Sequence, residues 1–257
     1  MNAQQDIPIS ENENVKNIFE LYQKHGMTQE KSDAESLIKH IEVMESQFGK
    51  VFEELQNVRS QLQSLQDKGI KATVTKIVDA VETKVTEAKA QFTSIKDSVV
   101  KSFSNAVNAV KEKGVSALKN TVDFLKIRPA LSFLKGKLDQ SVNSLRQSVT
   151  QIEKVKTELH AAKSHTLNVG RLIFKKDAKE TAYESNRGIL AGIQKLLNKT
   201  GSLLSGISGA AASAINKIDG LGQRNEKGSV RQSLKDIKNA RVKSEPSAPE
   251  QVRDNAR

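Results

Sequence analysis

The chain has 257 residues, 41 Lys and Arg against 30 Asp and Glu, eight Phe, two Tyr, four Pro, and neither Trp nor Cys. The lack of cysteine excludes disulfides, a thiolate nucleophile and cysteine metal sites. The few aromatic residues and prolines favour long helices over a thick globular core. No apolar stretch reaches the ~18 residues of a membrane-spanning helix, and no secretory signal opens the sequence, so we expect a cytoplasmic protein.

The net charge of +11 is unevenly distributed. Residues 1–69 hold 7 basic and 12 acidic side chains, residues 70–221 hold 25 and 13, and residues 222–257 hold 9 and 5. An acidic arm followed by a basic body predicts that the two pack on each other. The alternative is a basic face directed at nucleic acid or anionic lipid. We favour packing, because the acidic arm carries an apolar stripe that needs a partner.

Residues 1–12 are polar and are predicted to be disordered, and residues 13–25 are predicted to form a short helix that ends at Gly26. A long helix over residues 29–68 follows. Its apolar residues alternate in steps of four and three, which is the heptad pattern of a coiled coil. These predicted packing residues are Leu37, Ile41, Met44, Phe48, Val51, Leu55, Val58, Leu62 and Leu65.

The heptad of residues 29–68 does not match a parallel dimer. Such dimers prefer β-branched residues at a and Leu at d, and this helix tends to the reverse. Ile38 and Phe52 at e positions widen the stripe, and the e and g positions carry no consistent charge code. We therefore expect an antiparallel bundle within the chain. Asp67, Lys68 and Gly69 predict a reversal, with one continuous helix as the alternative.

A second long helix is predicted over residues 70–127, where Ile70, Val81, Phe92 and Phe103 are spaced eleven apart. This period of about 3.67 residues per turn is close to that of an untwisted helix. Pro129 separates it from the next helix. The polar side is rich in lysine, so residues 70–125 also offer an alternative as a basic amphipathic helix on anionic membrane. Packing of the apolar face in a core is the favoured interpretation.

Two further helices are predicted, over residues 129–165 and, rich in Gly and Ala, over residues 186–221. Residues 200–216 carry no charge, and their contact with a membrane stays an open alternative. Residues 222–257 are predicted to form a basic, mostly disordered tail. Within it, a short basic segment offers a contact surface for nucleic acid phosphates. Its residues are Arg231, Lys235, Lys238 and Arg241.

No motif indicates catalysis. The sequence has no Gly-rich phosphate loop, dinucleotide fingerprint or nucleophile elbow. The histidines His25, His40, His160 and His165 do not combine with carboxylates at metal-ligand spacing. We therefore expect a protein that is not an enzyme and has no catalytic, cofactor or metal residues.

Several short strings together carry a resemblance to a known family. They are Tyr22–Gly26, Ile38–Met44, Val81–Val85, Phe124–Ile127, Val169–Leu172 and Gly188–Ala191. The chain resembles an uncharacterised, all-helical domain-of-unknown-function family of Firmicutes, whose members lie among genes of mobile elements. This resemblance covers roughly residues 12–220, brings no catalytic residues, and implies an accessory role on a bacterial mobile element.

The sequence thus predicts an all-α, elongated antiparallel coiled-coil or helical bundle with a disordered C-terminal tail. Its expected function is structural or in protein interaction, without catalysis. The expected partner of each helix is another helix of the same chain, with homo-oligomers and other proteins left open. Binding to an anionic membrane surface is the first alternative, and binding to nucleic acid is the second.

Overall fold

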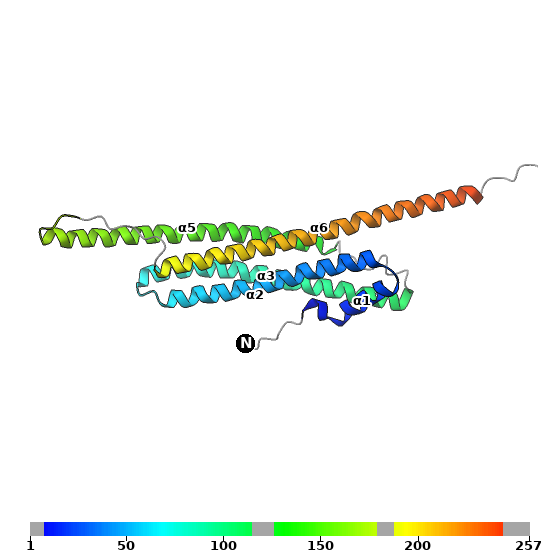
Figure 1. Ribbon diagram of the computed structural model, residues 1–257, viewed down its shortest axis with the longest axis horizontal. Coiled ribbons are helices and arrows are strands. Elements are labelled where there is room, and N and C mark those ends of the chain that lie inside the picture. The colour runs from blue at the N-terminus through cyan, green and yellow to red at the C-terminus, as the bar shows by residue number, and fades with distance from the viewer. Residues whose placement is uncertain (1–7, 115–125, 179–187, 244–257) are drawn as a thin grey trace, which may run out of the picture. The chain divides into compact units, whose positions relative to one another are not determined.

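The computed structural model describes residues 8–114, 126–178 and 188–243, with side chains up to Gly220. These residues contain helices and no strand, which confirms the predicted all-α fold (Figure 1). The chain divides into two units, Met1–Ile218 and Asp219–Arg257. The elements are η1 (Ile9–Glu11), α1 (Glu13–Lys24), α2 (Thr28–Gln63), α3 (Lys68–Lys113), α5 (Arg128–Ile173) and α6 (Ile189–Lys243).

Helices α2 and α3 form an antiparallel hairpin, as predicted. The chain reverses after Gln63, and the Asp67 carboxylate caps α3 by accepting a hydrogen bond of 2.9 Å from the Ile70 backbone N–H. The rings of Phe48 and Phe92 pack with centroids 5.3 Å apart. Intramolecular packing therefore covers the apolar stripe of α2, which excludes one continuous helix through residues 64–67.

Helix α5 packs antiparallel to α3. Lys84 Nζ lies 2.7 Å from Ser144 Oγ, and Lys137 Nζ lies 3.5 Å from Glu87 Oε2. In this register the start of α5 lies beside the middle of α3, so α5 does not reach the C-terminal part of α3. The remaining part of α3 is packed against α1, where Phe19 meets Phe103 edge-on at 6.1 Å. Helix α1 thus takes the place along α3 that α5 does not reach.

Helix α6 completes the bundle by contacting both α2 and α5. Lys199 Nζ lies 2.5 Å from Glu54 Oε1 on α2, and Ser208 Oγ donates a hydrogen bond of 2.6 Å to Asp139 Oδ1 on α5. Lys217 pairs further along with Asp33 on α2, and Gln194 with Lys156 on α5, so residue numbers rise along α6 as they fall along both neighbours. Among the described residues, α2, α3, α5 and α6 therefore form an up-down-up-down bundle, with neighbours antiparallel (Figure 1).

The interior of the bundle is mainly apolar. Every described helix contributes a stripe of buried residues at steps of three and four, as expected for helices with one covered face. Thr200, fully buried, fills a gap in the stripe of α6 by donating its hydroxyl to the Leu196 carbonyl. The buried side chains fill the space between the helices, as close packing requires.

Several predicted boundaries are corrected. Helix α3 ends at Lys113 and not at residue 127, because Gly114 adopts a left-handed φ of 75°. Residues 115–125 lie outside the described residues. Helix α5 continues to Ile173 and not only to residue 165, since the apolar pattern weakens there where no other described helix covers α5, and not where the helix ends.

More of the two terminal regions is helical than predicted. Ile9 is buried in η1, and the Ser10 backbone N–H donates a hydrogen bond of 3.1 Å to Glu42 Oε1, so the disorder predicted for residues 1–12 does not extend to residues 8–12. Helix α6 continues beyond residue 221 to Lys243, so the predicted tail is helical over residues 222–243. Residues 1–7 and 244–257 lie outside the described residues.

Replacing Phe48 tests the hairpin core. We expect Phe48→Ala to lower the free energy of unfolding by about 3–5 kcal/mol, because it removes a buried ring and leaves a cavity against Phe92. Denaturant titration followed by far-UV circular dichroism measures this loss. Phe133→Ala is the matched control, since its ring is 54% exposed, and equal losses in the two variants would contradict the assigned core.

Candidate functional site

The predicted coiled-coil packing residues lie in the interior of the bundle. Leu65 and Ile70, beside the reversal between α2 and α3, are half-buried, and the others are buried. Their apolar faces are occupied by neighbouring helices and leave no surface for a partner. A functional surface must therefore be sought on the outer faces and ends of the helices.

A column of polar residues on α2 faces α6. Its members are spaced seven apart, at the g positions of the heptad, so they lie one above another on the helix. Glu54 pairs with Lys199 at 2.5 Å and Asp33 with Lys217 at 4.0 Å. The column consists of Asp33, His40, Gln47, Glu54 and Gln61.

Glycines on α6 accept the two glutamines of this column. A Cβ at Gly206 would lie 2.8 Å from Gln47 Nε2, and a Cβ at Gly192 would lie closer still to Gln61 Oε1. Within the described residues, Oε1 of Gln47, Oε1 of Gln61 and Oε2 of Glu54 are buried without a hydrogen-bond partner. The two glutamines therefore contact α6 by close packing against its glycines, and not through hydrogen bonds of these oxygens. A charge code between e and g positions does not reveal this contact, whereas the spacing of two heptads between Gly192 and Gly206 is a signal that could have revealed it.

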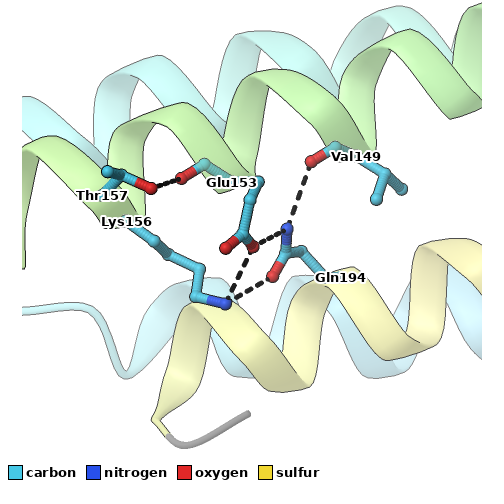
Figure 2. Close-up of polar contacts among 5 residues, drawn as sticks. All are labelled: Val149, Glu153, Lys156, Thr157 and Gln194. Atoms are coloured by element: carbon cyan, nitrogen blue, oxygen red, sulfur yellow. Dashed lines mark hydrogen bonds and ion pairs between the residues drawn. The ribbon is translucent and has the colours of Figure 1, made fainter. Parts of the chain in front are cut away.

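A second polar cluster joins α5 to α6 (Figure 2). Lys156, only 7% exposed, donates hydrogen bonds to Glu153 Oε2 at 3.0 Å and to Gln194 Oε1 at 2.8 Å. The amide of Gln194 donates in turn to Glu153 Oε2 at 2.8 Å and to the Val149 carbonyl at 3.2 Å. Figure 2 shows these groups pointing at one another between the two helices. Their geometry is that of a helix–helix clamp.

Further along the same interface, Asp139 accepts hydrogen bonds from Lys135 Nζ at 2.7 Å and from Ser208 Oγ at 2.6 Å. The hydrogen bond from Lys135 has the larger effect and that from Ser208 the smaller, and together they hold the pKa of the Asp139 carboxyl below its usual range. A shallow polar groove beside it is lined by Asn143, Arg146 and Ser205. The Ser208 hydroxyl and the Asp139 carboxylate of this groove are paired with each other, and their hydrogen bond joins α6 to α5.

The other predicted absences concern metals and membranes. In the described residues, no group of three or more His, Asp or Glu side chains could hold a metal ion. No described helix is long and apolar enough to cross a membrane. Residues Arg231, Lys235, Lys238 and Arg241 lie in α6, beyond the residues whose side chains are described, so this predicted contact surface stays a prediction.

The last part of α5 is uncovered by any described helix. We call residues 159–174 the α5 projection. It begins where Leu159 and Val155 share a groove with Asp67 and Ile70 at the reversal between α2 and α3. Figure 1 shows α5 running on past this reversal and past the start of α6. Its large apolar side chains are exposed: Leu159, Leu167, Val169, Leu172, Ile173 and Phe174.

The α5 projection therefore differs from the rest of the described bundle. Elsewhere in the described residues, the exposed large apolar residues are the scattered Val43, Phe133 and Ile189. Contiguous exposed apolar side chains mark interaction sites more often than scattered ones do. The predicted third helix ended at residue 165, so the side chains beyond that residue were not expected to lie on a helix.

Comparison with known proteins assigns the chain to a family. A family model described as "Family of unknown function (DUF6674)" matches residues 11–256. No curated protein and no solved structure matches the chain.

Replacing Gln194 tests the α5–α6 clamp. We expect Gln194→Leu to destabilise the protein by about 1–3 kcal/mol, because Lys156 loses a buried acceptor and the Val149 carbonyl loses a donor. Denaturant titration measures the change. Lys195→Ala, at the exposed neighbouring position, is the control and should stay within about 0.5 kcal/mol of the parent. An unchanged stability in Gln194→Leu would contradict the clamp.

The polar column predicts a pH dependence. Burial, followed by the charges of Lys217 on α6 and Lys39 on α2, lowers the pKa of His40 below its usual 6.5. The unfolded chain then binds a proton at this residue more readily than the folded chain does. The contribution of neutral His40 to the free energy of unfolding is therefore fully present above pH 6.5. It is lost as the pH falls from there through the pKa of His40 in the folded protein.

The difference between the parent and His40→Gln isolates this effect from the other histidines. We expect the parent to lose more stability than the variant when denaturant titrations are repeated on either side of this pH window. Identical pH profiles for the two proteins would show that His40 does not titrate with a lowered pKa.

Proposed function

The chain belongs to DUF6674, a family of unknown function, and from this premise we propose that it is a non-enzymatic helical scaffold that binds a partner through the α5 projection. The observation that carries the proposal is the concentration of exposed large apolar side chains on residues 159–174. Apolar surface of this kind gains free energy when a partner removes it from water.

The polar clusters of the bundle support a structural rather than a catalytic role. Lys156, Glu153 and Gln194 pair with one another between two helices, and Asp139 is held by Lys135 and Ser208. An active site needs reactive groups that converge on a space for substrate. These groups converge on each other.

The packing of α3 argues against the lipid-binding alternative at residues 70–125. The apolar side of α3, including Val81, Phe92 and Phe103, is buried in the bundle. On its polar side, Lys96 pairs with Glu45 at 2.6 Å, and Lys89 lies over the rings of Phe48 and Phe92. A helix that binds a lipid surface needs a free apolar face, so we place contact with partners on α5.

Other parts of the proposal rest on sequence alone. They are a cytoplasmic location and an accessory role on a bacterial mobile element, and the second is implied by the resemblance to a Firmicutes family. Nucleic-acid binding through the basic residues of α6 is the second alternative. A protein that does not shift the mobility of nucleic acid in a gel, even at low salt, would exclude it. A homo-oligomer is one form that the partner of α5 could take.

Site-specific photo-crosslinking in cells tests the scaffold proposal. A photoreactive amino acid at Val169 or Ile173, both on the α5 projection, should form adducts with a second protein, another copy of this chain or lipid. The same amino acid at the exposed Lys50 on α2 is the control and should give none. Equal yields at all three positions, or no adduct at Val169 and Ile173, would refute a binding role for the projection.

A further inference from the structure

The tip of the α5 projection is formed by three consecutive large apolar residues. Leu172, Ile173 and Phe174 are 61%, 72% and 76% exposed, so exposure rises toward the end of the helix. Arg171 precedes them, and Lys175 and Lys176 follow. The tip therefore combines an apolar end with a basic collar.

The arrangement of the three side chains limits what can cover them. Successive residues of an α-helix point about 100° apart, so the three span more than half of the circumference. A helix that packs sideways covers an apolar stripe of about 100° or somewhat more, which is less than the three side chains span. A single partner helix would leave at least one of the three in water, whereas a medium that surrounds the end of the helix would cover them all.

The backbone at the tip is closed by hydrogen bonds. The N–H groups of Phe174, Lys175 and Lys176 donate to the carbonyls of Gly170, Leu172 and Arg171 at 3.3, 3.0 and 2.9 Å. Lys175 takes a left-handed φ of 52°, which turns the chain as a helix C-terminal cap does. Carbonyls that are already paired lower the cost of placing a helix end in an apolar medium, where water cannot satisfy them.

The charge of the projection selects an anionic surface. Between Glu158 and Asp177 the chain has no acidic residue, and it carries four basic ones: Lys163, Arg171, Lys175 and Lys176. Arg171 Nε also donates to the Asp177 carbonyl at 2.8 Å, which holds the turn after the tip. Lysines next to an apolar tip can keep their ammonium groups at the level of lipid headgroups while their stems lie deeper.

From this geometry we propose that the tip of α5 inserts Leu172, Ile173 and Phe174 into the interface of an anionic lipid bilayer, with Arg171, Lys175 and Lys176 on the headgroups. The proposal rests on the scaffold function and names the partner of its α5 projection. It differs from binding through residues 70–125, since the contact is the end of one helix and not the side of another.

A fluorescence experiment on the full chain tests insertion directly. The protein has no tryptophan, so Phe174→Trp supplies the sole indole at the tip, and Phe133→Trp supplies a matched exposed indole on the bundled part of α5. Vesicles of phosphatidylcholine and phosphatidylglycerol in equal parts should shift the emission of Phe174→Trp to the blue. They should leave that of Phe133→Trp unchanged, and an unchanged Phe174→Trp would overturn the proposal.

Vesicle flotation separates the apolar and electrostatic contributions. Leu172→Ser/Ile173→Ser/Phe174→Ser and Lys175→Glu/Lys176→Glu should each lower the partition coefficient on these anionic vesicles at least about tenfold. Phe133→Ser and Lys76→Glu/Lys154→Glu remove comparable exposed groups elsewhere and should stay within about twofold. The parent protein should bind vesicles of pure phosphatidylcholine more weakly than vesicles that also contain phosphatidylglycerol.

The outcomes distinguish this proposal from the scaffold function. Flotation that the tip variants leave unchanged would place lipid contact elsewhere and overturn the inserted tip. Crosslinks from Ile173 to a protein, together with no flotation, would overturn the lipid partner and leave the scaffold proposal standing. A mass that doubles in solution and falls to that of a monomer in the triple Ser variant would assign the tip to a second copy and also overturn the lipid partner.

Discussion

The antiparallel register between α2 and α3 is the constraint on which the rest of the fold depends. The contact of Phe48 with Phe92 fixes which parts of the two helices face each other, and the capping of α3 by Asp67 fixes where the chain reverses. The end of the bundle lies at this reversal. Helix α5 follows the register of α3 and continues beyond it, so the uncovered α5 projection is a consequence of where the hairpin turns.

The polar column between α2 and α6 favours one register of α6 against α2 more than it adds stability. Buried oxygens of Gln47, Glu54 and Gln61 lack hydrogen-bond partners in the described residues, which costs free energy. Yet Gly192 and Gly206 provide room for the glutamines only in one register of α6. A shift of α6 by one heptad would oppose Gln61 to Lys199. Polar groups that weaken a core while excluding other registers are known from coiled coils.

Much of the fold could be predicted from the sequence, because it depends on apolar periodicity. The stripe of α2 and its hairpin with α3 both follow from apolar residues at steps of three and four. The errors arose where periodicity does not report on structure. Gly114 ended α3 through its φ angle, and α5 remained helical where no other described helix covers it. The α5 projection was missed for this reason, since an uncovered helix shows no buried stripe.

The apolar tip of α5 has no role within the fold that the structure describes. Leu172, Ile173 and Phe174 bury little surface in the bundle, so polar residues at these positions would leave the free energy of unfolding nearly unchanged. The paired carbonyls and the left-handed turn at Lys175 hold the end of the helix together without them. Free energy from the three side chains is thus available almost entirely for binding. A surface that can surround the helix end makes fuller use of it than a partner packed along one side.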